Sequence, residues 1–105
     1  MVTIYNKLVR DRIPEIIKNA GKIAEYEVLS QADYAKMLEK KLDEETAEYH
    51  ASKNVEELAD ILEVLYALAE SSGCSADELE RLRARKAQER GGFKKRLFLK
   101  KVIEE

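Results

Sequence analysis

Two segments with helical spacing are separated by only three residues, Ser52-Lys53-Asn54, and this short join strongly constrains the fold. Ser30 can cap a first helix that extends to about Ser52, and Asn54 can cap the next helix. A join of this length makes the two helices antiparallel neighbours. Residues at equal distances from the turn then lie opposite one another. The sequence therefore predicts a long helical hairpin at the centre of the chain.

Four acidic side chains are placed symmetrically about this turn. Glu45 and Glu48 precede it, and Glu57 and Asp60 follow it. Each pair has i, i+3 spacing, which puts both members on one helix face. Folding about the turn sets Glu48 opposite Glu57, and it sets Glu45 opposite Asp60. Like charges this close repel one another unless protons or a cation intervene. An all-oxygen cluster of this kind suits a hard divalent ion such as Mg²⁺ or Mn²⁺.

Three of these carboxylates also have ordinary structural explanations. Glu45 and Glu48 can belong to a solvated helix surface, where most Glu residues lie. Glu57 stands three residues after Asn54 and can be its capping-box partner. Asp60 differs, because it lies within an apolar stretch and too far from the helix start to cap it. A buried acid there needs a partner. Spacing alone leaves two alternatives, a metal site and a solvated acidic face.

The remaining segments predict a mainly α domain with a short two-stranded β ribbon. A short helix is expected over residues 11–18, and a last helix from a Ser75–Glu78 capping box to about Arg90. Residues 24–28 alternate between apolar and acidic side chains, as a half-buried strand does. Residues 93–102 predict a second strand. These terminal segments could pair beside the helices.

The composition fits a single domain that spans residues 1–105. Hydrophobic residues make up 45% and charged residues 38%, with one Pro and four Gly, which is typical of a mostly helical chain. The net charge of −2 gives no bias toward nucleic acid or anionic membranes, and no apolar run approaches membrane-span length. Cys74 and His50 are the only residues of their kinds, so the usual zinc sites and an internal disulfide are excluded. We expect a cytoplasmic protein without a signal peptide.

The helix that follows Asn54 is apolar almost all round between Leu58 and Leu68, which predicts the central, most buried helix. One hairpin and one short further helix leave this surface hard to cover within 105 residues. We therefore expect a homodimer or a higher homo-oligomer.

The two acid pairs and the neighbouring Glu44 resemble the signature of the all-α nucleoside triphosphate pyrophosphatase superfamily. This group includes the MazG-like proteins and phosphoribosyl-ATP pyrophosphohydrolase. The matching pattern is E-E-x-x-E followed by E-x-x-D. The resemblance implies a set of metal ligands, namely Glu45, Glu48, Glu57 and Asp60. It also implies a catalytic site with Glu44 as an auxiliary acid.

Two flanking segments, residues 5–11 (YNKLVRD) and 89–93 (ERGGF), resemble a small single-domain branch of the same superfamily. The resemblance therefore covers nearly the whole chain. It implies a Mg²⁺-dependent hydrolase that cleaves a nucleotide between its α- and β-phosphates. The products would be a nucleoside monophosphate, or a phosphoribosyl-AMP-like product, and pyrophosphate, which would suit the removal of non-canonical nucleotides. The alternative is a non-catalytic helical interaction module with a degenerate acidic site.

A polyphosphate substrate also needs cations from the protein, and five basic residues are candidates: Lys7, Arg10, Lys86, Arg90 and Lys94. Lys86 and Arg90 follow two leucines along one helical stripe, which predicts that they continue a core-facing surface. Most Lys and Arg side chains are solvated, so surface charge is the alternative for all five. The basic run that begins at Lys94 could also be a charged edge strand.

Overall fold

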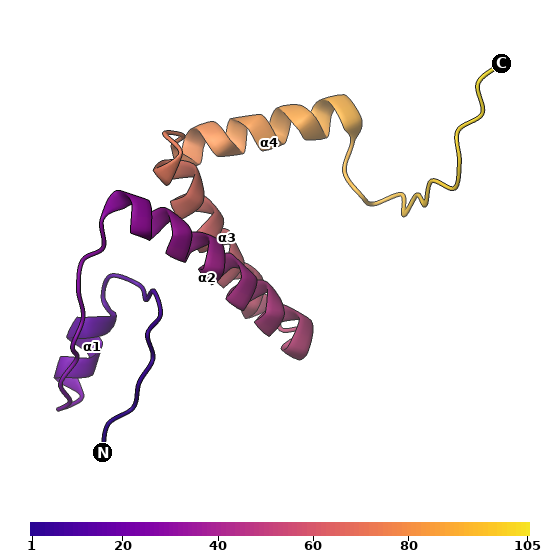
Figure 1. The fold of residues 1–105 in the computed structure, drawn as a ribbon. Coiled ribbons are helices and arrows are strands. Elements are labelled where there is room, and N and C mark those ends of the chain that lie inside the picture. Colours follow the sequence, from indigo (N-terminus) through magenta and orange to yellow (C-terminus); the bar gives the residue numbers. More distant parts are fainter.

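The computed structural model describes all 105 residues, and its regular structure consists of helices (Figure 1). The four helices are α1 (Ile13–Asn19), α2 (Gln31–Ser52), α3 (Val55–Ser71) and α4 (Ala76–Arg90). The predicted mainly α character is confirmed. The helices α2 and α3 form an antiparallel hairpin, with α1 near one side and α4 extending from the far end of α3 (Figure 1). None of the helices combines the length and the apolar character that crossing a membrane requires.

Each of the three long helices begins at the capping residue that the sequence predicts. In every case the cap oxygen accepts a hydrogen bond from a first-turn amide: Ser30 from Asp33 at 3.2 Å, Asn54 from Glu56 at 3.0 Å, and Ser75 from Glu78 at 3.1 Å. These bonds satisfy amides that have no partner within the helix itself. The predicted boundaries of the hairpin are thereby confirmed.

The turn of the hairpin consists of Lys53 and Asn54, which separate the end of α2 from the start of α3. Lys53 adopts a left-handed conformation with φ of 58°. Its amide donates a hydrogen bond to the carbonyl oxygen of Tyr49 at 2.7 Å. A left-handed residue at this position ends a helix by satisfying a carbonyl of its last turn. The chain therefore reverses direction abruptly, and positions equidistant from the turn face each other across it.

The predicted β ribbon is wrong, because the structure contains no strand. Residues 22–30 and 97–105 are extended but lie far apart, since α4 carries the second segment away from the first (Figure 1). A strand needs a partner for its backbone groups, and neither segment reaches one. Within the second predicted strand, the Arg96 amide bonds to the Phe93 carbonyl oxygen at 3.0 Å and forms a turn. The expected buried face is also missing, because Val28 is 91% exposed.

Little apolar surface is buried within one chain. Leu38 and Val64 are the buried hydrophobic residues, at 2% and 9% exposure. The leucines of the other α3 face, Leu58, Leu62 and Leu65, are 44%, 45% and 38% exposed. The prediction that α3 is the most buried helix is therefore wrong for the single chain, in which α3 has one buried residue and α2 has two. Its physical reason is that α2 covers one side of α3, whereas α4 meets α3 only near its end (Figure 1).

The overall dimensions describe an open arrangement of helices. The chain exposes 10015 Å², whereas a compact monomer of 12.1 kDa exposes about 6,000 Å². Its radius of gyration is 18.7 Å, compared with about 13 Å for a compact domain of this length. The extents of 67 × 32 × 21 Å agree with this elongated shape. Apolar surface therefore remains uncovered both on α3 and on the terminal segments of the chain.

Candidate metal centre

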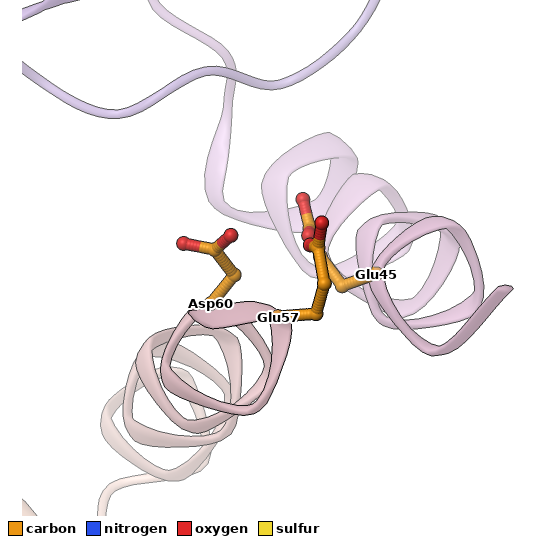
Figure 2. A group of neighbouring side chains, drawn as sticks. All are labelled: Glu45, Glu57 and Asp60. Atoms are coloured by element: carbon orange, nitrogen blue, oxygen red, sulfur yellow. The ribbon is translucent and has the colours of Figure 1, made fainter. Parts of the chain in front are cut away.

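Three of the acids that flank the turn converge between the two helices of the hairpin. The carboxylates of Glu45, Glu57 and Asp60 each provide one oxygen, and these oxygens lie within 4.8 Å of one another. Glu45 projects from α2, while Glu57 and Asp60 project from α3 toward the same space (Figure 2). The i, i+3 spacing places the two α3 acids on one face, as predicted. We name these three residues the acid cluster.

Glu45 is the buried member of the acid cluster, with 8% exposure. Its Oε1 lies 3.5 Å from Nζ of Lys41. Its Oε2 is buried and has no hydrogen-bond partner. Leaving a buried carboxylate oxygen without a partner is costly. A cation bound by the acid cluster would satisfy this oxygen.

The other two predicted acids lie beside the acid cluster. Glu48 is exposed on α2, but its charge raises the pKa of both Glu45 and Glu57. Glu44 is half-buried and pairs with Nζ of Lys41 at 3.3 Å. Glu48 therefore contributes negative potential to the site, whereas Glu44 is partly neutralised by the lysine that also faces Glu45.

Two members of the acid cluster, Glu45 and Glu57, resist ionisation. Burial raises the pKa of Glu45 above its ordinary value, and the charges of Glu48 and Asp60 raise it further, while Lys41 opposes the shift. The pKa of Glu57 is also raised, first by loss of hydration and then by the charges of Glu48, Asp60 and Glu45. A divalent cation would act in the opposite direction, because it favours the charged form of each carboxylate.

This electrostatic arrangement predicts a pH-dependent effect of Glu45→Gln on the protein without metal. The folded-state pKa of Glu45 is raised above 4.5. At pH values just above 4.5, the folded state therefore binds more protons than the unfolded state. The free energy of unfolding of the wild-type protein therefore falls as the pH rises through the pKa of Glu45. Glutamine cannot ionise, so the variant should gain stability relative to wild type between about pH 4 and pH 7.

Urea unfolding in EDTA at both pH values measures this gain. Glu39→Gln is the matched control, because Glu39 is an exposed acid of α2 outside the acid cluster. A stability difference between wild type and Glu45→Gln that does not change with pH would contradict the prediction.

Asp60 has a basic partner that spacing did not indicate. Nη2 of Arg10 donates a hydrogen bond to Oδ1 of Asp60 at 2.7 Å. The two side chains are 58% and 41% exposed, so Asp60 is not the deeply buried acid that its apolar neighbours in the sequence suggest. The partners are 50 positions apart, and no local pattern relates them. The structure thus brings one of the five predicted phosphate-binding residues to the acid cluster.

The other four basic candidates form no ion pair in the structure. Lys86 and Arg90 are exposed on α4, so the predicted core-facing stripe is wrong. Its physical reason is that α4 extends beyond the hairpin and has no helix opposite these residues (Figure 1). Nζ of Lys7 lies 5.5 Å from the ring centre of Tyr5, and Lys94 is exposed in the turn after α4.

The donor set of the acid cluster fits a hard divalent ion. Oxygen ligands of Mg²⁺ lie about 2.1 Å from the ion, and therefore about 3 to 4.2 Å from one another. Oxygens within 4.8 Å of one another need only small side-chain adjustments to reach this spacing. Mg²⁺ usually keeps several positions for water and phosphate oxygens. The partly exposed Glu57 and Asp60 leave one side of the site open for such ligands.

Comparisons with known proteins do not establish a family for this chain. No family model matches the sequence, and no solved structure matches it. An uncharacterized protein of Mycolicibacterium smegmatis is 48% identical over 46 residues. The aligned part is 44% of this chain and 47% of the mycobacterial protein, so the match spans about half the length of that relative. These comparisons therefore show neither a family nor a function for the chain.

Proposed function

We propose that this chain is a Mg²⁺-dependent nucleotide pyrophosphohydrolase that cleaves between the α- and β-phosphates. The observation that carries the metal site is the unpartnered, buried Oε2 of Glu45 beside the carboxylates of Glu57 and Asp60. The choice of a nucleotide substrate rests on the resemblance of the acid pairs and the flanking segments to the pyrophosphatase superfamily. The products would be a monophosphate and pyrophosphate.

The roles of the acids follow from their positions. Glu45, Glu57 and Asp60 would hold Mg²⁺, or Mn²⁺ in its place, which when bound neutralises phosphate oxygens and lowers the pKa of a bound water. Glu48 is exposed beside the site and could ligate as well or accept a proton from the attacking water. Glu44 forms an ion pair with Lys41 and would stabilise the helix turn that carries Glu45. Direct attack by water requires no covalent intermediate.

Self-association is part of the proposal, because burial of the exposed leucines of α3 against another copy of the chain would remove apolar surface from water. A homodimer or higher homo-oligomer would provide this burial. Basic residues that lie far from the acids of their own chain, Lys86, Arg90 and Lys94, could then approach the site of another copy. We also propose a cytoplasmic location, which suits a protein whose single cysteine, Cys74, is free.

A panel of nucleotides tests this function. Canonical, non-canonical and phosphoribosyl-linked nucleotides are incubated with the protein and Mg²⁺, and the products are identified by phosphorus NMR. We expect pyrophosphate and a monophosphate from at least one substrate, with loss of turnover in EDTA and recovery when Mg²⁺ is restored. Release of orthophosphate would show that the bond assignment is wrong. Failure to turn over any member of the panel would favour the non-catalytic interaction module, to which the exposed apolar face of α3 is also suited.

A further inference from the structure

The acid cluster has basic neighbours on two sides. Lys41 approaches Glu45 along α2, where both residues belong to the same helix. Arg10 approaches Asp60 from the segment that precedes α1, and Nη2–Oδ1 is 2.7 Å. Arg10 is therefore the basic side chain that reaches the cluster from outside the hairpin. Even with both cations present, Oε2 of Glu45 remains without a partner.

The ion pair between Arg10 and Asp60 is exposed and can be broken at a small cost in free energy. Both side chains are substantially exposed, at 58% and 41%, and exposed ion pairs contribute little to stability. The backbone of Arg10 is fixed separately, because its carbonyl oxygen accepts a hydrogen bond from the Ile13 amide at 3.1 Å. The guanidinium can therefore leave Asp60 while the backbone stays at the start of α1.

A divalent ion at the acid cluster would disfavour this pair. The ion and the guanidinium would both be positive and would share the carboxylate of Asp60, so each weakens the binding of the other. A guanidinium that leaves a carboxylate finds an equivalent partner in a phosphate group, which accepts the same forked hydrogen bonds.

We propose that Arg10 is a displaceable counter-ion of the acid cluster. A divalent cation that enters the cluster releases the guanidinium from Asp60, and the released side chain then pairs with a phosphate oxygen of the substrate. This inference rests on the proposed metal site and adds to it a coupling between metal binding and phosphate recognition. Arg10 acts here as a substrate-positioning residue.

Mn²⁺ affinity measured at low, constant ionic strength tests the competition. Removing the competing charge with Arg10→Gln should tighten Mn²⁺ binding by about two- to five-fold, as expected for the loss of an exposed ion pair. Arg12→Gln is the matched control, because Arg12 is two positions away and pairs with Glu15 at 3.4 Å instead of with the cluster. Arg10→Lys keeps the charge and should bind Mn²⁺ like wild type.

Two further readouts follow the released side chain. The guanidinium NMR signals of Arg10, assigned by comparison with Arg10→Gln, should shift when Mg²⁺ is added. In turnover assays Arg10→Gln should raise KM for the nucleotide although metal binding is not weakened. The inference would be overturned if Arg10→Gln bound Mn²⁺ as tightly as wild type or more weakly, or if the guanidinium signals of Arg10 did not shift on addition of Mg²⁺. Neither result would contradict the metal site itself. Failure of wild type to bind Mn²⁺ would overturn the proposed function together with the inference.

Discussion

Glu45→Gln is expected to abolish Mg²⁺-dependent hydrolysis, lowering kcat/KM by at least about 100-fold. Glu45 is the buried acid of the cluster, and its free Oε2 is the ligand atom least able to find another partner. The amide has nearly the same shape but carries no charge, so the site would lose both a ligand and much of its attraction for a divalent ion. Pyrophosphate release over a range of Mg²⁺ concentrations measures the effect.

The loss of activity must be separated from misfolding. Glu39→Gln makes the same chemical change at an exposed position of α2 and should keep activity close to wild type. Circular dichroism and thermal unfolding in EDTA should show that Glu45→Gln folds, and is at least as stable as wild type at pH 7. A well-folded Glu45→Gln protein with wild-type turnover would exclude Glu45 from the metal site.

Leu62→Glu is expected to convert an oligomer into monomers of much lower stability. Leu62 lies at the middle of the exposed α3 face, between Leu58 and Leu65, and is 45% exposed in the single chain. The chain exposes 10015 Å², roughly 4,000 Å² more than a compact monomer of its mass. Obligate dimers bury about 2,000 Å² or more in total. A charge at the centre of such an interface would be desolvated without a partner.

Sedimentation velocity at low micromolar concentration measures the association state. Val28→Glu is the matched control, because it introduces the same side chain at an apolar position that is 91% exposed and lies outside α3. That variant should remain as associated as wild type. A wild-type protein that sediments as a stable monomer would contradict self-association, and dissociation by Val28→Glu alone would place the interface elsewhere.

The hairpin and the three residues of the acid cluster could be predicted because they depend on residues close to the turn in sequence. The caps Ser30 and Asn54 act on the first turns of their own helices, and the short join determines which helices are neighbours. Once the turn is known, its symmetry brings Glu45 and Asp60 together across it. Burial could not be predicted in the same way, since it depends on what covers α3.

The errors concern contacts between distant parts of the chain. Apolar and acidic residues do alternate over residues 24–28. Whether this segment pairs as a strand depends on the position of the C-terminal segment, which α4 carries away from it. The stripe that contains Lys86 predicts a buried face only if another helix lies opposite, and α4 has none there. The bond between Arg10 and Asp60 joins positions 50 residues apart and has no signature in spacing. Each of these features could be predicted only if the arrangement of the helices in space were known.

Anomalous diffraction from a crystal grown or soaked in Mn²⁺ tests the central claim most directly. The acid cluster should show an anomalous peak within about 2.1 to 2.3 Å of one oxygen from each of Glu45, Glu57 and Asp60, as expected for a hard divalent ion. Oε2 of Glu45 should be among these ligands. A density map with no peak at the cluster, in which Glu45 contacts only Lys41 and Asp60 contacts only Arg10, would contradict the proposed metal site.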